Sequence, residues 1–323
     1  MMKQPYQECT LGYSILEKQD LDAIHEATLK LMEEFGVRVF GEQAHEIYSS
    51  AGCHVDKETN MVRFPPNLVN DCIESAPAEY TLYARDPEKN IVIGGKRVTF
   101  TNFGTGVYIL DPYTGERRST TKEDLCNIAR FIDAVDEVDC ITIPVAATDV
   151  PEEIKELHEA EAIFHNTSKH FGHDTDGGAN TRRFIRMAAA VAGGMDALRE
   201  KPIVSLGACP NSPLELHEAA TEQIIEAAKA GIPMDVLSMG LCGGTTPVTL
   251  AGTILTTNCE ILSGIILGQL VRKGTPMMYG SSTSIMDLKL TTSPVGAPEH
   301  AMFGAAIGQM GHYYGIPTDV GGT

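Results

Sequence analysis

One junction recurs three times in this sequence and constrains the fold more than any other feature. Each copy is a glycine, one further residue and a proline, placed after a helical pattern and before an apolar run: Gly231-Ile232-Pro233, Gly274-Thr275-Pro276 and Gly315-Ile316-Pro317. Glycine takes the left-handed conformation after a helix, and proline makes the chain leave that turn extended. The repeat therefore predicts a series of similar helix-to-strand units.

Apolar runs between the helical patterns predict seven buried strands, at 98–103, 141–146, 170–173, 203–208, 234–239, 277–280 and 316–320. Strands that alternate with helices form either an open doubly wound sheet or a (β/α)8 barrel. No G-x-G-x-x-G follows the first strand, which favours the barrel. We therefore expect an α/β fold in which residues 99–323 form a TIM barrel that is incomplete at its C-terminus, with about seven strands.

Residues 1–98 are expected to form a mixed α/β segment that packs on this barrel. A helical stripe ends at Gly36, another helix begins at Pro65-Pro66, and Gly94-Gly95 is expected to join strands at 91–93 and 97–100 as a hairpin. Two capping boxes are also expected in the barrel, Thr120 with Glu123 and Ser212 with Glu215.

The charge balance limits the possible partners. The sequence has 25 basic and 43 acidic residues, a formal net charge of −18. Nucleic acid and anionic membranes would require a basic face, so neither is expected as a partner.

Cysteine spacing and apolar segments indicate the compartment. The eight cysteines include no C-x-x-C, so neither a zinc ribbon nor a disulfide framework is predicted. The N-terminal ten residues lack the apolar core of a signal peptide, and a cytoplasmic location is expected. Residues 249–271 are long and apolar enough for a membrane-spanning helix. Asn258, Glu260 and Gln269 interrupt the stretch, which favours a buried helix.

Polar residues gather at the predicted C-terminal ends of the strands, where barrel enzymes place their chemistry. His173-Asp174-Thr175-Asp176 could ligate a metal or serve as hydrogen-bonding and acid–base residues. No second cluster has metal-type spacing, so no metal is expected. No G-x-S-x-G elbow supports a nucleophilic serine.

Other features at these ends have two interpretations each. Gly240, Gly243 and Gly244 could cradle a phosphate, although tight packing is favoured. Glu299 could be catalytic or simply a carboxylate favourable to a helix N-terminus. Four aromatic residues could form part of a cage for a cationic amine: Phe103, Tyr279, Tyr313 and Tyr314.

Three segments near the C-terminus closely resemble the trimethylamine methyltransferase family of methylotrophic methanogens and some bacteria. They are YGSSTSIMD at 279–287, GAPE at 296–299 and HYYGIP at 312–317. The N-terminal LKLMEEFGV at 29–37 and YARDP at 83–87 look like the family too, so the resemblance spans the chain.

The resemblance implies a (β/α)8 enzyme that moves a methyl group from trimethylamine to the cobalt(I) of a cognate corrinoid protein in methylotrophic methanogenesis. The corrinoid would be carried by that partner, with no cofactor bound permanently to this chain. A homo-oligomer is expected.

Archaeal members of the family use pyrrolysine, encoded by an in-frame amber codon, a little after the segment that resembles 312–317. The last residue of this sequence is Thr323. We therefore expect pyrrolysine at position 324, directly after Thr323, with the sequence cut short at its amber codon. The 323-residue form would then lack its electrophile.

Barrel position and the resemblance together give the candidate site residues. Asp319, Asp174 and Asp176 are the catalytic candidates, as acids that would protonate an imine and stabilise a positive adduct. The substrate-binding candidates are Phe103, Tyr279, Ser281 and Glu299. The rim at 281–285 is expected to dock the corrinoid protein.

Three alternatives stay open at this point. Relatives without pyrrolysine demethylate glycine betaine or a similar quaternary amine. A phosphate-binding barrel lyase and a non-catalytic amine-binding module are the other two.

Overall fold

The computed structural model describes residues 14–321 of the chain. The N-terminal residues on which the expectation of no signal peptide rests lie outside this part. Thr323, the residue after which pyrrolysine is expected, also lies outside the described residues. The structure therefore does not test the expected position of the electrophile, and pyrrolysine after Thr323 stays a prediction.

The N-terminal part consists of three helices, a small sheet and a hairpin. Its elements are α1 (Lys18–Glu34), β1 (Val37–Val39), α2 (Glu42–Ser50), β2 (His54–Asp56), β3 (Met61–Arg63), α3 (Pro66–Ser75), β4 (Glu79–Leu82) and β5 (Ile91–Gly94). The three helices pack against α9 (Leu250–Val271). β1 pairs in parallel with the two-residue strand β10 (Glu215–Leu216), which follows the fourth predicted barrel strand, so the N-terminal part is tied directly to the main sheet region.

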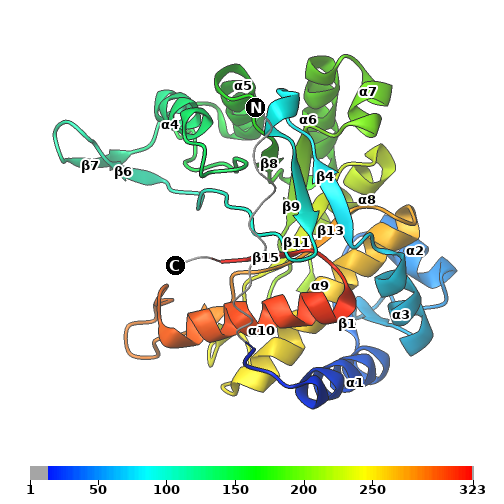
Figure 1. The fold of residues 1–323 in the computed structure, drawn as a ribbon. Helices are drawn as coiled ribbons and strands as arrows, with labels where there is room; N and C mark the ends of the chain where they lie inside the picture. Colours follow the sequence, from blue (N-terminus) through cyan, green and yellow to red (C-terminus); the bar gives the residue numbers. More distant parts are fainter. Residues whose placement is uncertain (1–13, 322–323) are drawn as a thin grey trace.

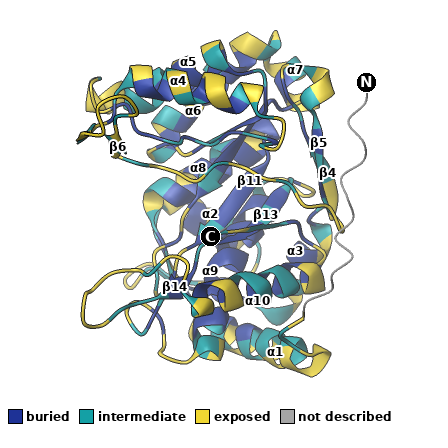
Figure 2. Ribbon diagram, turned by 60° about the vertical axis from the view of Figure 1, so that its left-hand side comes forward, coloured by how far each residue is buried: buried dark blue, intermediate teal, exposed yellow. Residues whose placement is uncertain are grey.

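A five-stranded parallel sheet forms the centre of the molecule. Its order is β15-β13-β11-β9-β8, with β8 at Phe171–His173, β9 at Val204–Ala208, β11 at Met234–Ser238, β13 at Met277–Ser281 and β15 at Thr318–Val320. These strands confirm five of the seven predicted ones. Figure 2 shows the central strands as buried ribbon between helices whose outer faces are exposed.

The first two predicted strands, 98–103 and 141–146, are not regular strands, and that prediction was wrong. Both segments nevertheless run beside the sheet in the expected order. Isolated parallel bridges join Ile141 to Phe171 of β8, and Gly106 to Val145. Asn102 explains part of the irregularity, because its side chain, rather than its backbone, bonds the backbone of Thr142. The sheet is a curled parallel half-barrel, and closure into an eight-stranded barrel stays a prediction.

Helices cover the convex side of the curled sheet. They are α4 (Lys122–Ala134), α5 (Lys155–Asn166), α6 (Gly177–Ala192), α7 (Met195–Glu200), α8 (Glu218–Ala230), α9 and α10 (Pro298–Tyr314). Gly231, Gly274 and Gly315 all adopt positive φ after their helices, as the repeated junction predicts. In Figure 1, α9 and α10 lie below the sheet, while the hairpin of β6 (Tyr108–Leu110) and β7 (Arg117–Ser119) projects away from the body.

Three local predictions were wrong. The N-terminal hairpin pairs β4 with β5, rather than 91–93 with 97–100. The capping box of α4 is Thr121 with Asp124, one residue later than expected. No helix begins after Ser212, because Glu215 pairs with β1 and α8 starts only after His217, whose ring accepts from the Ala220 N–H.

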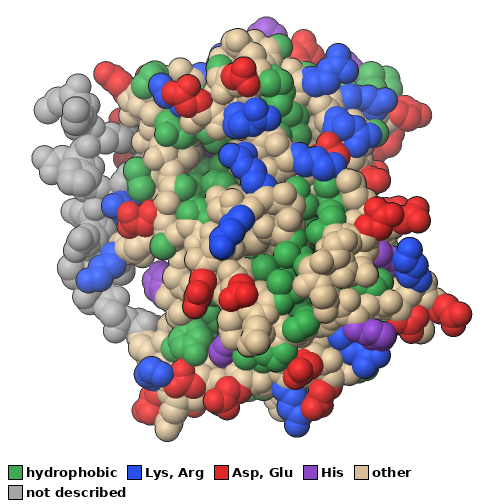
Figure 3. Space-filling model, turned by 90° about the vertical axis from the view of Figure 1, so that its right-hand side faces the viewer, with side chains coloured by type: hydrophobic (Ala, Val, Ile, Leu, Met, Phe, Trp, Pro, Cys, Tyr) green, Lys and Arg blue, Asp and Glu red, His purple; other side chains and the backbone are tan. Residues whose placement is uncertain are grey.

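The apolar stretch at 249–271 forms α9, a helix long and apolar enough to cross a membrane but mostly buried inside the protein. This agrees with the predicted buried helix. Figure 3 shows lysine and arginine side chains interspersed with acidic ones on one face of the molecule. The net negative charge is therefore not a continuous acidic surface on that face.

Candidate active site

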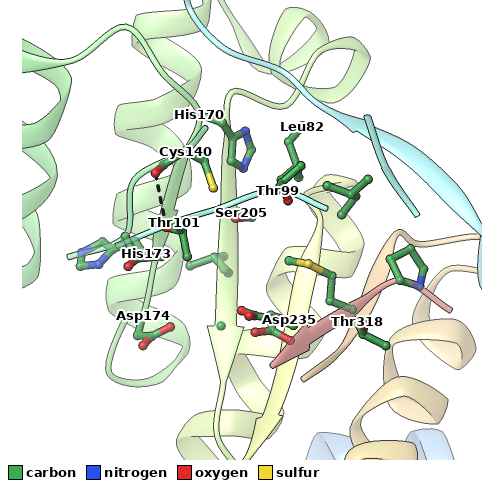
Figure 4. Close-up of a pocket in the computed structure, with 18 of the residues that line it drawn as sticks. Leu82, Thr99, Thr101, Cys140, His170, His173, Asp174, Ser205, Asp235 and Thr318 are labelled. Atoms are coloured by element: carbon green, nitrogen blue, oxygen red, sulfur yellow. Dashed lines mark hydrogen bonds between the residues drawn. The ribbon is translucent and has the colours of Figure 1, made fainter. Parts of the chain in front are cut away.

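A cavity of about 1300 Å³ occupies the concave side of the curled sheet. Its walls come from the inward-facing positions of the strands, from the segment at 93–107 and from the N-terminal ends of α5 and α6. No phenylalanine or tyrosine lines it within the described residues, so the expected aromatic cage is not formed there. Figure 4 shows threonine, serine, histidine and aspartate side chains among the residues that line it.

An arc of three carboxyl groups crosses the floor of this cavity. Asp174 directly follows β8, Asp235 lies in β11 and Asp319 lies in β15, and all three line the cavity. In a parallel ladder, paired residues face the same side of the sheet, and Asp235 pairs with Gly207 and Met278, which point the same way. Figure 4 shows Asp174 and Asp235 directed into the open space.

Asp235 and Asp319 behave as one acid pair. Burial, together with the nearby charge of Asp319 and a hydrogen bond to its carboxyl, raises the pKa of Asp235 well above its ordinary value. Burial also raises the pKa of Asp319, while its hydrogen bond with Asp235 opposes that rise. Two carboxylates in contact cannot both ionise readily, so the pair retains a proton to higher pH than a free carboxyl would.

Further acids surround the pair. Burial raises the pKa of Asp174, although a hydrogen bond from the Gly207 N–H opposes this. Burial also raises the pKa values of Glu156 and Glu159 at the α5 wall, where Glu159 accepts from the Ala147 N–H. Asp235 and Glu159 are buried, Asp319 and Glu156 are half-buried, and Asp174 is exposed toward the cavity. Several carboxyl groups thus face one cavity, an arrangement that favours a cationic occupant.

The two histidines of the cavity that lie on and beside β8 are neutral. Burial lowers the pKa of both His170 and His173 to about 4. His170 donates from Nδ1 to the Tyr83 carbonyl, and His173 donates from Nε2 to the Glu156 carbonyl. The other ring nitrogen of each is buried without a partner. His173 also packs against aromatic rings of the core, which makes it a core residue as well as a wall residue.

No group of three or more histidine, cysteine, aspartate or glutamate side chains within residues 14–321 has the geometry to hold a metal ion. The metal interpretation of 173–176 therefore gains no support. Asp176 instead lies at the N-terminus of α6, at the edge of the cavity, where its N–H donates to Glu156.

The structure brings the three predicted catalytic residues into one cavity, but not the four predicted substrate-binding residues. Phe103 is 77% exposed, and Glu299 lies in the first turn of α10. Tyr279 and Ser281 are buried, where Tyr279 donates to Asn258 of α9 and Ser281 donates to Thr283. None of the four lines the cavity among the described residues.

The glycines considered for phosphate binding serve local structure. The N–H of Gly240 bonds the Thr283 hydroxyl, that of Gly243 bonds the Thr246 carbonyl, and that of Gly244 bonds the Leu241 carbonyl. A phosphate cradle needs free N–H donors, so the packing interpretation has the better support.

Asp235 is the main residue that sequence reasoning missed. It is the second residue of β11, whereas the candidates predicted from the sequence lie at the C-terminal ends of the strands. A signal was present, because a single aspartate interrupts the apolar run Met234-Asp235-Val236-Leu237. A charged residue in a strand buried on both faces requires a polar environment on one of them.

Comparisons with known proteins agree along the whole chain. A family model described as trimethylamine methyltransferase (MTTB) matches residues 2–323. Trimethylamine methyltransferase MttB of Desulfitobacterium hafniense (strain DSM 10664 / DCB-2) is 49% identical over 311 residues, which cover 96% of this chain and 63% of the relative. MttB of Methanosarcina thermophila is 39% identical over 316 residues, covering 96% of this chain and 65% of the relative.

A glycine betaine methyltransferase of Desulfitobacterium hafniense (strain Y51) is also similar, with 33% identity over 311 residues covering 96% of this chain and 64% of the relative. The chain therefore spans just under two thirds of the length of these curated relatives.

Among solved structures, the hydroxylamine MtmB complex matches with a TM-score of 0.59 and 10% identity, over 93% of this chain and 66% of that one. The monomethylamine methyltransferase MtmB of Methanosarcina barkeri matches with a TM-score of 0.57 and 11% identity, over the same shares. At such identity these matches show the fold alone. The family model and the curated relatives show more, and the chain belongs to the trimethylamine methyltransferase family.

Proposed function

We propose that the full-length protein transfers a methyl group from trimethylamine to the cobalt of a cognate corrinoid protein in methylotrophic metabolism. The family relationship supports the reaction class, and the carboxyl arc across Asp174, Asp235 and Asp319 supports the site. A reaction that passes through a quaternary ammonium needs negative charge around it, and these three groups would supply it from one side of the cavity.

The acid pair gives this site a proton as well as charge. Because the pKa values of both Asp235 and Asp319 are raised, one would donate a proton while the other stabilises the positive adduct. Asp174, across the cavity floor, would contribute charge alone. Asp176 lies at the edge and would act on substrate entry rather than on chemistry.

The electrophile in this proposal is a pyrrolysine directly after Thr323, which the family resemblance implies. An imine there would accept the amine lone pair, and the acid pair would protonate the imine nitrogen. Mass spectrometry of the native protein across residue 324 tests this element, and an ordinary amino acid at that position would remove it.

The corrinoid would arrive on a partner protein, and its cobalt would accept the methyl group. Ser281, Thr283 and Ser284, within the rim expected to dock that partner, are buried. The exposed apolar side chains of the neighbouring loops are better placed for docking: Met239, Val248, Leu288, Leu290 and Val295. A homo-oligomer in the cytoplasm completes the proposal.

A quaternary amine such as glycine betaine is the second candidate, favoured by the glycine betaine methyltransferase relative. Its carboxylate would have to enter a cavity that already contains several acids. Lys155 also lines that cavity, but its ammonium is already paired with Glu152. Like-charge repulsion therefore favours trimethylamine.

The experiment is a comparison of the two amines with the full-length protein and the corrinoid partner. Methylation of the cobalt(I) corrinoid from trimethylamine, with slower or absent transfer from glycine betaine, is the expected result. Faster transfer from glycine betaine would favour the second candidate. Amine binding without transfer in either case would indicate the non-catalytic module.

A further inference from the structure

Glycines alternate with the acids of the arc across five adjacent strands. In the order β8, β9, β11, β13 and β15, the positions on the concave face are Asp174 just after β8, then Gly207, Asp235, Gly280 and Asp319. Asp235 pairs with Gly207, and Gly280 pairs with Asp319. The partner of Asp235 on β13 is Met278, so Gly280 lies two residues further along that strand, on the same face. Each glycine thus separates two acids.

The space above each glycine is filled by a carboxyl group. A Cβ at Gly207 would lie 2.2 Å from Asp174 Oδ1, and a Cβ at Gly280 would lie 2.3 Å from Asp235 Oδ1. Neither glycine has the positive φ that would itself call for glycine. The constraint at both positions is therefore room for a neighbouring carboxyl rather than backbone conformation.

Other buried glycines of the same region have different neighbours. A Cβ at Gly264 or Gly268, in α9, would meet the apolar side chains of Val236 or Met277. A Cβ at Gly172, on the same concave face, would meet side-chain atoms of a threonine and a serine at 3.2 Å or more. Close approach to a carboxyl is thus specific to the two glycines of the arc among these five.

We propose that Gly207 and Gly280 are positioning residues that let the acids of the arc lie flat across the neighbouring strands. Gly207 leaves room for the Asp174 carboxyl, which occupies the place that a side chain at 207 would take. Gly280 leaves room for the Asp235 carboxyl, so that this side chain extends across β13 toward Asp319 in β15. The inference concerns the geometry of the arc and holds whichever amine the arc binds.

Gly280 differs from an ordinary packing glycine because the cost of a side chain at this position depends on one residue, Asp235. The methyl group of an alanine at 280 would displace the Asp235 carboxyl. In a variant without that carboxyl, the methyl group would have room. The cost of Gly280→Ala should therefore depend on Asp235, which a double-mutant cycle measures directly.

The experiment uses the full-length protein and measures thermal unfolding of four forms: wild type, Gly280→Ala, Asp235→Ala and the double variant. Gly280→Ala is expected to lower Tm by several degrees in the wild-type background and by much less in Asp235→Ala. Gly308→Ala, in α10 with nothing within 4 Å of its Cβ, is the control and should change Tm equally in both backgrounds.

If Gly280→Ala alone does not fold, recovery of a folded protein in the double variant supports the same coupling. An equal loss of Tm in both backgrounds, or a double variant that also fails to fold when Asp235→Ala folds, overturns the proposal. Because no readout uses methyl transfer, failure of the proposed reaction would leave this result intact.

Discussion

Asp235 and Asp319 belong to strands that do not pair with each other, yet their carboxyl groups are close enough across the intervening strand β13 for each to shift the pKa of the other. The residue of β13 between them is Gly280, whose missing side chain leaves the space. This proximity gives the cavity a coupled acid pair rather than two independent carboxylates, and it determines how the site responds to pH.

Asp235→Asn should make the protein less sensitive to pH. The pKa of Asp235 is raised in the folded state, so folding favours its protonated form. Its contribution to stability is full below the ordinary value of 3.8 and is lost as pH rises through its raised folded pKa. An asparagine cannot ionise and does not suffer this loss.

Thermal unfolding between about pH 4 and about pH 8 checks this prediction. Tm of the wild type is expected to fall relative to that of Asp235→Asn as pH rises, leaving the variant the more stable form at the upper end. A constant difference between the two proteins across the range would show that Asp235 is not perturbed.

Tyr279→Phe should weaken the fold. The Tyr279 hydroxyl donates to Asn258, whose amide in turn bonds Thr28 of α1 and Tyr314 of α10. Loss of the hydroxyl leaves the buried Asn258 oxygen unsatisfied, at a cost of about 1–3 kcal/mol in the free energy of unfolding.

Denaturant unfolding measures this cost, and Tyr313→Phe is the matched control. The Tyr313 hydroxyl donates to the exposed Asp22, so its loss should change stability by less than about 0.5 kcal/mol. An unchanged stability of Tyr279→Phe with a raised KM for the amine would instead restore Tyr279 as a substrate-binding residue.

Glu260→Ala should destabilise the loop that follows β9. The buried Glu260 carboxylate accepts from the Leu214 N–H at 2.8 Å and from the hydroxyls of Ser212 and Ser238 at 2.8 and 2.5 Å. Removal of this acceptor should cost about 1–3 kcal/mol for each buried donor left unpaired.

Glu260→Gln keeps one acceptor oxygen and should cost less than Glu260→Ala. Limited proteolysis at 209–216, together with denaturant unfolding, distinguishes the two. Equal stability of Glu260→Ala and wild type would mean that water replaces the carboxylate without loss.

The parts of the fold that the sequence predicts well are those with strong local signals. The junctions at Gly231, Gly274 and Gly315 and the apolar cores of β9, β11 and β13 need no distant partner to be recognised. Segments 98–103 and 141–146 looked like strands for the same reason. Their pairing depends on side-chain contacts such as that of Asn102 with Thr142, which no local pattern contains.

The candidate site was predicted in part. Asp174 directly follows β8, and Asp319 lies near the end of the strand predicted at 316–320, where position alone indicates chemistry. Asp235 is the second residue of β11, and the two glycines are the fourth residues of β9 and β13. Their relationship depends on the order and register of five strands. Tyr279 was expected at a strand end, but the alternation along β13 turns its side chain toward α9, and it does not line the cavity.

The most direct test of the account is a single-turnover measurement of methyl transfer from trimethylamine to the cobalt(I) corrinoid partner, with full-length wild type and Asp235→Asn. If the acid pair supplies the proton and the charge, Asp235→Asn should transfer methyl about 10²–10⁴-fold more slowly while remaining folded. A rate equal to that of the wild type would contradict the assignment of the Asp235–Asp319 pair as the catalytic centre.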